Sequence, residues 1–165
     1  MTDHVHLNLF TMASVEHVSP GSWRYPGDRS PEYTDTAYWT EVARTAERGG
    51  FEAVFFADVR GIYDVYGDDR AAAIERAVQT PATDPQLVVP AMAAVTDELG
   101  FAVTRSTTYT HPYQLAREFS TLDHLTDGRI AINVVTSYLA SAAENLGLDE
   151  RMDKETRYDR ADEFL

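Results

Sequence analysis

The sequence predicts a parallel α/β fold made of four successive strand–helix units. Four short apolar runs, at residues 5–10, 51–57, 101–104 and 129–136, are rich in the β-branched and aromatic residues that strands favour. Helical patterns lie between these runs, and regular alternation of strand and helix implies parallel strands joined by right-handed crossovers. Two of the runs, FEAVFFAD and RIAINVVTS, are nearly continuous in apolar residues, which is typical of strands buried on both faces.

The first helix has clear start and stop signals. Thr34 and Asp35 can cap it, an apolar face recurs at helical spacing to about Arg48, and Gly49-Gly50 ends it. The second strand follows at once, so the connection from helix to strand is short.

Three further helices are predicted from similar signals. Asp84 followed by Pro85 supplies an N-cap and a first turn for a helix that ends at Gly100. A third helix is expected over residues 111–127, where a His-Pro pair opens it and an Asp-Gly pair stops it. A fourth begins near residue 155 and continues to residue 165.

This order fits two architectures, an open doubly wound sheet and a (β/α)₈ barrel. No G-x-G-x-x-G follows any strand, so the dinucleotide-binding open sheet has no support. The long connections at 11–34, 59–83 and 137–154 all follow carboxyl ends of strands, where barrels carry their active sites. A barrel of this class needs about 250 residues, so four units would form half of one. A first strand in the centre of the sheet would favour the open sheet instead.

The composition excludes several classes of protein. Hydrophobic residues make up 44% and charged residues 25%, which argues for a globular domain and against disorder. With no cysteine, the chain has no disulfide, zinc-thiolate site or thiol nucleophile. No run is long enough for a membrane helix and the N-terminus lacks the features of a signal peptide, so we expect a cytoplasmic protein without a membrane partner.

The chain is strongly acidic, and its basic residues are almost all arginine. A formal net charge of -13 argues against nucleic acid, because binding it requires cations that displace counterions from phosphates. Lys154 is the only lysine, and acidic side chains are spread along the whole chain. Such a surface is typical of adaptation to high salt, which screens self-repulsion. The alternative is a merely acidic cytosolic protein.

Four longer stretches resemble one protein family. They are HLNLFTMASVEH, FEAVFFADVRGIYDVYG, FAVTRSTTYTHPYQLAREFSTLDHLTDGRIAINVVTSY and ETRYDRADEFL. The chain is similar to the bacterial-luciferase-like flavin monooxygenases, within the group that includes nitrilotriacetate, dibenzothiophene-sulfone and long-chain alkane monooxygenases. The combination of HPYxxAR, xxTLDHLTxGR and NVVTS is the most specific part of this signature.

The resemblance implies a TIM barrel of which residues 1–165 form the N-terminal portion of a single domain. It also implies an enzyme that uses reduced FMN and O₂ to oxygenate a small organic substrate of the alkane, sulfone or aminocarboxylate type. A separate NAD(P)H-dependent flavin reductase would supply the FMNH₂. The flavin-phosphate site draws on a later part of the barrel.

A second hypothesis is a truncated, catalytically inactive half-barrel that self-associates or pairs with a partner chain. Four units leave two open parallel edges, which favour association, so we expect a homo-oligomer. A third is an open-sheet flavin-binding domain without oxygenase chemistry.

The resemblance assigns flavin contacts to residues at or beyond the carboxyl ends of the strands. They are Asp58, Thr104, Asn133, Ser137, Tyr138 and Tyr158. Hydroxyls can donate to flavin carbonyls, and an amide inside an apolar strand needs a buried polar partner. The alternatives are an ion pair with Arg60 or a helix cap for Asp58, β-propensity for Thr104, and aromatic packing for Tyr158.

The resemblance also places His17, Tyr63 and Gln79 in the active site as catalytic residues. All three fall in segments that follow strands, and His17 could donate a proton to activated oxygen or to an alkoxide. For a single loop histidine, a surface position is the alternative. Ser14 and Tyr138 stand where the alkane-type enzyme has Cys and His, so roles of those two side chains are absent here.

No metal site is expected. The remaining histidines are scattered without the spacing of a zinc motif. They are His4, His6, His111 and His124.

The acidic surface leads to a prediction about salt. Circular dichroism should report more native structure at ~2 M KCl than at ~0.1 M, because salt screens repulsion between exposed carboxylates. Equally native spectra at both concentrations would refute halophilic adaptation.

Overall fold

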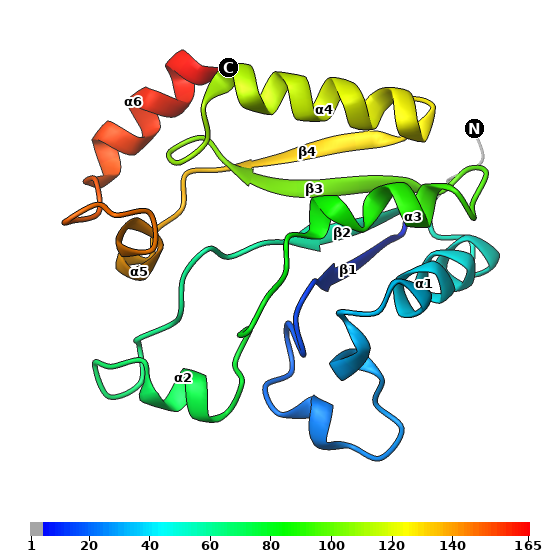
Figure 1. Ribbon diagram of the computed structural model, residues 1–165, viewed down its shortest axis with the longest axis horizontal. Helices are drawn as coiled ribbons and strands as arrows, with labels where there is room; N and C mark the ends of the chain where they lie inside the picture. Colours follow the sequence, from blue (N-terminus) through cyan, green and yellow to red (C-terminus); the bar gives the residue numbers. More distant parts are fainter. Residues whose placement is uncertain (1–4) are drawn as a thin grey trace.

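The computed structural model describes residues 5–165 and contains one sheet of four parallel strands in the order β1-β2-β3-β4 (Figure 1). The strands are β1 (Asn8–Met12), β2 (Ala53–Ala57), β3 (Gly100–Ser106) and β4 (Ile130–Val135). The helices are α1 (Thr36–Arg48), α2 (Ala71–Glu75), α3 (Val89–Ala93), α4 (Pro112–Thr126), α5 (Ala140–Glu144) and α6 (Lys154–Phe164), with short 3₁₀ turns at η1 (Ser22–Arg24), η2 (Ser30–Glu32) and η3 (Pro85–Leu87).

The strand order decides between the two architectures. Each strand pairs with the next one along the chain, so β1 lies at an edge and not in the centre. Sequential parallel neighbours are the arrangement of a barrel wall, and the open-sheet alternative is therefore wrong. β1 and β4 are the two edges of the sheet.

Two predicted elements differ from the observed ones. The first strand was expected at residues 5–10 but spans Asn8–Met12, because Asn8 is the first residue that faces a partner, Ala53 of β2. The long helix predicted from Asp84 to Gly100 is broken into η3 and α3. Pro90 has no N–H to donate, and a continuous helix would need that donor.

The other helices follow their sequence signals. Asp35 accepts a hydrogen bond from the Ala37 N–H at 2.8 Å and so caps α1. His111 Nδ1 accepts from the Tyr113 N–H and caps α4, which ends at Asp127 in a left-handed conformation. The predicted fourth helix is α6, which begins one residue earlier than expected.

One face of the sheet packs against α1, α3 and α4 and forms the core. Val54, Phe56, Phe101 and Val103 have almost no exposed surface there, because alternate residues of each strand point to the same face. Trp39 of α1 joins this core edge-on to Phe56, and its indole N–H donates to the carbonyl of Tyr33.

The opposite face, which would line a barrel interior, is only partly covered. Phe10 is 52% exposed although its ring lies 5.3 Å from that of Phe55 on the next strand.

Among the described residues, no helix is long and apolar enough to cross a membrane. Figure 1 shows all four strands pointing their carboxyl ends toward the side where α2, α5 and α6 lie.

A single carboxylate anchors the start of β3. Glu47 Oε1 accepts hydrogen bonds from the backbone N–H groups of Asp97, Glu98 and Leu99 at 2.8, 2.8 and 3.1 Å. These bonds, that from Glu98 above all, hold the pKa of the Glu47 carboxyl below its usual range. The charged form of Glu47 thus connects α1 to the residues that enter β3.

Glu47→Gln should lower the urea midpoint near neutral pH, because an amide oxygen is a weaker acceptor for three N–H groups than a carboxylate. The folded-state pKa lies below the ordinary 4.5, so this stabilisation is present above about pH 4.5 and is lost as the pH falls through the folded-state value. The difference between wild type and variant should therefore shrink toward about pH 3. Glu75→Gln, which removes the same charge from an exposed helix position, is the control; a constant difference across the range would contradict the assignment.

Candidate functional site

Buried polar atoms without partners mark the carboxyl end of the sheet. Among residues 5–165, five buried side-chain atoms have no hydrogen-bond partner. They are Glu16 Oε1, His17 Nδ1, Gln79 Oε1, Tyr109 Oη and Thr110 Oγ1. All five belong to segments that follow β1, β2 or β3. Buried polar atoms are nearly always paired in folded proteins, so this concentration at one end indicates a place built to receive a polar ligand.

The first part of the site joins the segments after β1 and β2. Gln79 Nε2 donates to the backbone carbonyl of His17 at 2.8 Å, so the structure brings these two predicted catalytic residues together. Gln79 adopts a left-handed conformation with φ of 50°, which is strained for a side chain of this type. Glu16 accepts from the Gly21 N–H, and burial raises the pKa of its carboxyl despite that bond.

His17 is poised to exchange a proton. Its ring lies edge-on to Phe10, with centroids 4.3 Å apart, and burial lowers the pKa of the imidazole. The ring is therefore neutral at pH 7, and its buried Nδ1 remains open to a ligand because no described residue pairs with it.

Tyr63, the third predicted catalytic residue, contacts Tyr138. The two phenol oxygens are 2.8 Å apart and the ring centroids 6.4 Å apart. Burial, and then the hydrogen bond from Tyr138, raises the pKa of Tyr63 to about 12, so its phenol stays protonated at neutral pH.

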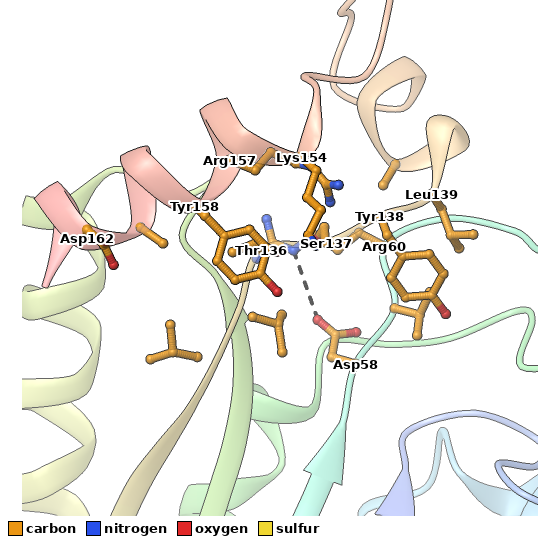
Figure 2. A pocket seen from close by; sticks show the side chains of 15 residues that line it. Asp58, Arg60, Thr136, Ser137, Tyr138, Leu139, Lys154, Arg157, Tyr158 and Asp162 are labelled. Carbon is orange, nitrogen blue, oxygen red and sulfur yellow. Dashed lines mark ion pairs between the residues drawn. The ribbon is translucent and has the colours of Figure 1, made fainter.

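The second part of the site is a cleft of about 630 Å³ between the ends of β2 and β4 and the helix α6. This volume lies within the range of small-molecule and cofactor sites. Figure 2 shows the labelled side chains converging on it from these elements. Four predicted flavin contacts line the cleft: Asp58, Ser137, Tyr138 and Tyr158. Three cations, Arg60, Lys154 and Arg157, line it as well.

Asp58 faces this cleft from the end of β2. Its carboxylate lies 4.0 Å from Arg60 Nε, the ion pair drawn in Figure 2, and 3.6 Å from Arg105 Nη1. Burial raises the pKa of Asp58, and the two arginines only partly offset that effect. The expected ion pair with Arg60 exists, but Arg105 approaches more closely.

The sequence analysis missed Arg105. It lies on β3 with only 2% of its side chain exposed, and its guanidinium donates to Asp84 Oδ1 at 2.6 Å and to Gln86 Oε1 at 2.9 Å. It therefore ties the end of β3 to η3 and to Asp58. The available signal was an arginine inside the apolar run FAVTRST, since arginine is almost never fully buried unless it is paired.

Thr104 and Asn133 form a relay across three strands. Asn133 Nδ2 donates to Thr104 Oγ1 at 2.9 Å, and Thr104 Oγ1 donates to the carbonyl of Phe56 at 2.7 Å. The buried polar partner expected for Asn133 is thus supplied by the sheet itself. The flavin contacts predicted for both residues remain predictions.

The exits of β4 and α6 complete the cleft. Ser137 has a left-handed φ of 56° and its hydroxyl donates to Ser106 Oγ at 2.9 Å, so a side-chain bond holds a strained backbone in place. Tyr158 projects from α6 with half of its surface exposed, and the ammonium of Lys154 lies 5.8 Å from its ring centroid.

The segments after β2 and β4 are fastened to each other. Ser141 Oγ of α5 accepts from the Ile62 N–H and donates to the Ile62 carbonyl, both at 2.9 Å. A Cβ at Gly61 would lie 2.4 Å from Ser141 Oγ and 2.8 Å from the Ala142 nitrogen, so only glycine permits this approach. The two walls of the cleft thereby hold a fixed separation.

Within residues 5–165, no group of three or more histidine, aspartate or glutamate side chains could hold a metal ion. His6 Nδ1 lies 2.5 Å from Glu52 Oε1, and His111 caps α4. His4 lies outside the described residues.

The four parallel strands thus form part of a barrel wall, with a cleft at their carboxyl ends. The chain belongs to the luciferase-like monooxygenase family, whose sequence profile matches residues 11–165. The predicted family and the TIM-barrel fold class are therefore confirmed.

Individual relatives agree with this membership. The chain is 54% identical over 165 residues to the long-chain alkane monooxygenase of Geobacillus thermodenitrificans, covering all of this chain and 38% of that protein. It is 48% identical to the dimethyl-sulfide monooxygenase of Hyphomicrobium sulfonivorans, covering 34% of that protein. The chain thus spans little more than a third of the length of these relatives.

Solved structures give the same result. A crystal structure of long-chain alkane monooxygenase superposes with a TM-score of 0.96 over 99% of this chain and 38% of that one. A riboflavin lyase crystallised with modified FMN has a TM-score of 0.88 at 34% identity, covering 98% of this chain and 36% of that one. The relatives are flavin-dependent monooxygenases of the luciferase-like family.

Replacing Arg105 by Met should lower the free energy of unfolding by about 3–5 kcal/mol, because Asp58 and Asp84 lose a buried counter-charge. The pKa of Asp58 should rise further, which side-chain carboxyl NMR can follow. Arg105→Lys keeps the charge and should cost less. Arg117→Met on the exposed face of α4 is the control, expected within about 0.5 kcal/mol of wild type in urea denaturation. Equal effects at the two positions would show that Arg105 does not hold the site together.

Proposed function

We propose that this chain is the N-terminal portion, residues 1–165, of one TIM-barrel domain of an FMN-dependent, two-component monooxygenase. The observation that carries the proposal is the concentration of unpaired buried polar atoms and a cofactor-sized cleft at the carboxyl end of the sheet. Barrel enzymes place their chemistry at that end, and the family to which the chain belongs is flavin-dependent.

The residues around the cleft fit an FMN molecule. Arg60, Lys154 and Arg157 outnumber the two acidic lining residues, Asp58 and Asp162, so the cleft carries a small excess of positive charge that suits an anionic cofactor. The hydroxyls of Ser137, Tyr138 and Tyr158 can exchange hydrogen bonds with ring carbonyls, and Asp58 can accept from a ring N–H. In this proposal, Thr104 and Asn133 support the floor of the pocket through their relay.

Bound reduced FMN would supply the two electrons that let one atom of O₂ enter an organic substrate while the other leaves as water. His17 is neutral and its Nδ1 has no partner among the described residues, so it can take up a proton from a ligand and then pass that proton to oxygen at the barrel mouth. Gln79 positions His17 by bonding its backbone carbonyl, and its own Oε1 is free to accept from a ligand. Tyr63 donates or accepts through a phenol that stays protonated.

A separate NAD(P)H-dependent flavin reductase would deliver the reduced FMN, and cytoplasmic placement suits that supply. The names of relatives span alkane, dimethyl sulfide and nitrilotriacetate, so the proposed substrate is a small organic molecule.

A non-catalytic half-barrel that self-associates is the second candidate. The half-exposed Phe10 on the inner face and the two open edges of the sheet favour it. Light scattering across a concentration series tests this candidate, which predicts oligomers and no uptake of flavin.

An anaerobic titration of the 165-residue chain with reduced FMN in molar KCl tests the first proposal. We expect saturable one-to-one binding, and at least a tenfold loss of affinity in Asp58→Ala, about 1.4 kcal/mol. Since Asp58 also neutralises Arg105, Tyr158→Ala provides a second variant at an exposed position, which should weaken binding without moving the urea midpoint.

Asp149→Ala removes the same charge from an exposed loop and should bind as wild type does. A chain that is folded by circular dichroism yet takes up no FMN would refute the proposed flavin pocket.

A further inference from the structure

We infer that the organic substrate is an uncharged, apolar molecule held in a second pocket, formed by Pro20 and residues 63–78 next to the cleft. This inference rests on the proposed function, and it selects one substrate class among those that a small-molecule oxygenase of this kind can take.

The pocket has a volume of about 450 Å³ and is lined mainly by carbon. Its walls come from the connection between β2 and α2, from α2 itself, and from the segment after β1. The apolar lining residues are Pro20, Val65, Ala72, Ala73 and Val78. A pocket of this size and lining favours ligands that lose little hydration on binding.

The charged groups at this pocket do not form a receptor for an anion. Asp69 Oδ1 accepts the Ala71 N–H at 2.8 Å, so its negative charge remains beside the start of α2. Arg76 is exposed and lines the same pocket as Asp69, so the two charges of the lining sum to zero. A polycarboxylate would therefore lose its hydration and meet no net positive charge, which is unfavourable.

The rim of the pocket is unusually apolar for a surface. Val65 is 81% exposed and Tyr66 is 78% exposed, and both line the pocket. Exposed apolar side chains gathered around a hollow indicate a binding function.

One hydrogen bond connects this pocket to the cleft. Tyr63 lines the apolar pocket, Tyr138 lines the cleft, and their phenol oxygens are 2.8 Å apart. The pair forms a shared wall, so a molecule in the pocket lies next to a ligand in the cleft. Because Tyr63 is a neutral phenol at neutral pH, that wall presents no charge to an apolar substrate.

The test is methyl NMR on the 165-residue chain without flavin, with alanine and valine methyls labelled. n-Octane is the apolar probe and nitrilotriacetate is the charged probe. We expect n-octane to shift the methyl signals of Ala72, Ala73 and Val78 saturably, and nitrilotriacetate to leave them unchanged.

Two matched substitutions on α2 locate the binding. Ala72→Phe fills the pocket and should weaken n-octane binding at least tenfold. Ala71→Phe adds the same ring to an exposed position one residue earlier and should change the affinity less than twofold.

Nitrilotriacetate binding at these methyls, absence of n-octane binding, or equal effects of the two substitutions would each overturn the inference. The FMN titration fails or succeeds independently. Octane binding without FMN binding would refute the proposed oxygenase function but support the apolar pocket. FMN binding without octane binding would support the oxygenase function but refute the apolar pocket.

Discussion

The side chain of Arg105 is only 2% exposed, so the positive charge of its guanidinium must be neutralised inside the protein. Carboxylates from two separate segments neutralise it. Arg105 contacts Asp58 at the end of β2 and Asp84 at the start of η3, while itself belonging to β3. These contacts connect the ends of β2 and β3 to the start of η3, beside the cleft that Asp58 lines. Asp58 therefore faces the cleft on one side and the charge of Arg105 on the other.

The sequence was sufficient for the elements with local signals. The Asp35 cap and the opening of α4 at His111 follow from short patterns that act within a few residues, whereas the order of the strands in the sheet came from the folded chain. The helix expected from Asp84 to Gly100 was wrong because Pro90 interrupts the backbone ladder after a valid N-cap. β1 was displaced because pairing with β2, and not hydrophobicity, sets where a strand begins.

The site was less accessible to sequence reasoning. The resemblance supplied Asp58 and Tyr158, and the structure places both on one cleft. The contact between Tyr63 and Tyr138 joins residues 75 positions apart, and no local pattern encodes it. Arg105 had a visible signal in its apolar surroundings, but its partners Asp84 and Gln86 depended on the turn of η3, which only the folded chain reveals.

The bond between Ser141 and Ile62, with Gly61 beside it, has a consequence for how such proteins diversify. Position 61 cannot accept a side chain, because a Cβ there would clash with Ser141. The Ser141 hydroxyl both accepts a hydrogen bond from Ile62 and donates one to it, so these positions tolerate little change. Residues 63–78 lie just beyond this fastening and contain the apolar pocket. In the proposed function, mutations at residues 64–78 would reshape what the pocket accepts while the bond between Ser141 and Ile62 keeps the cleft in place, so the choice of substrate could change separately from the reaction.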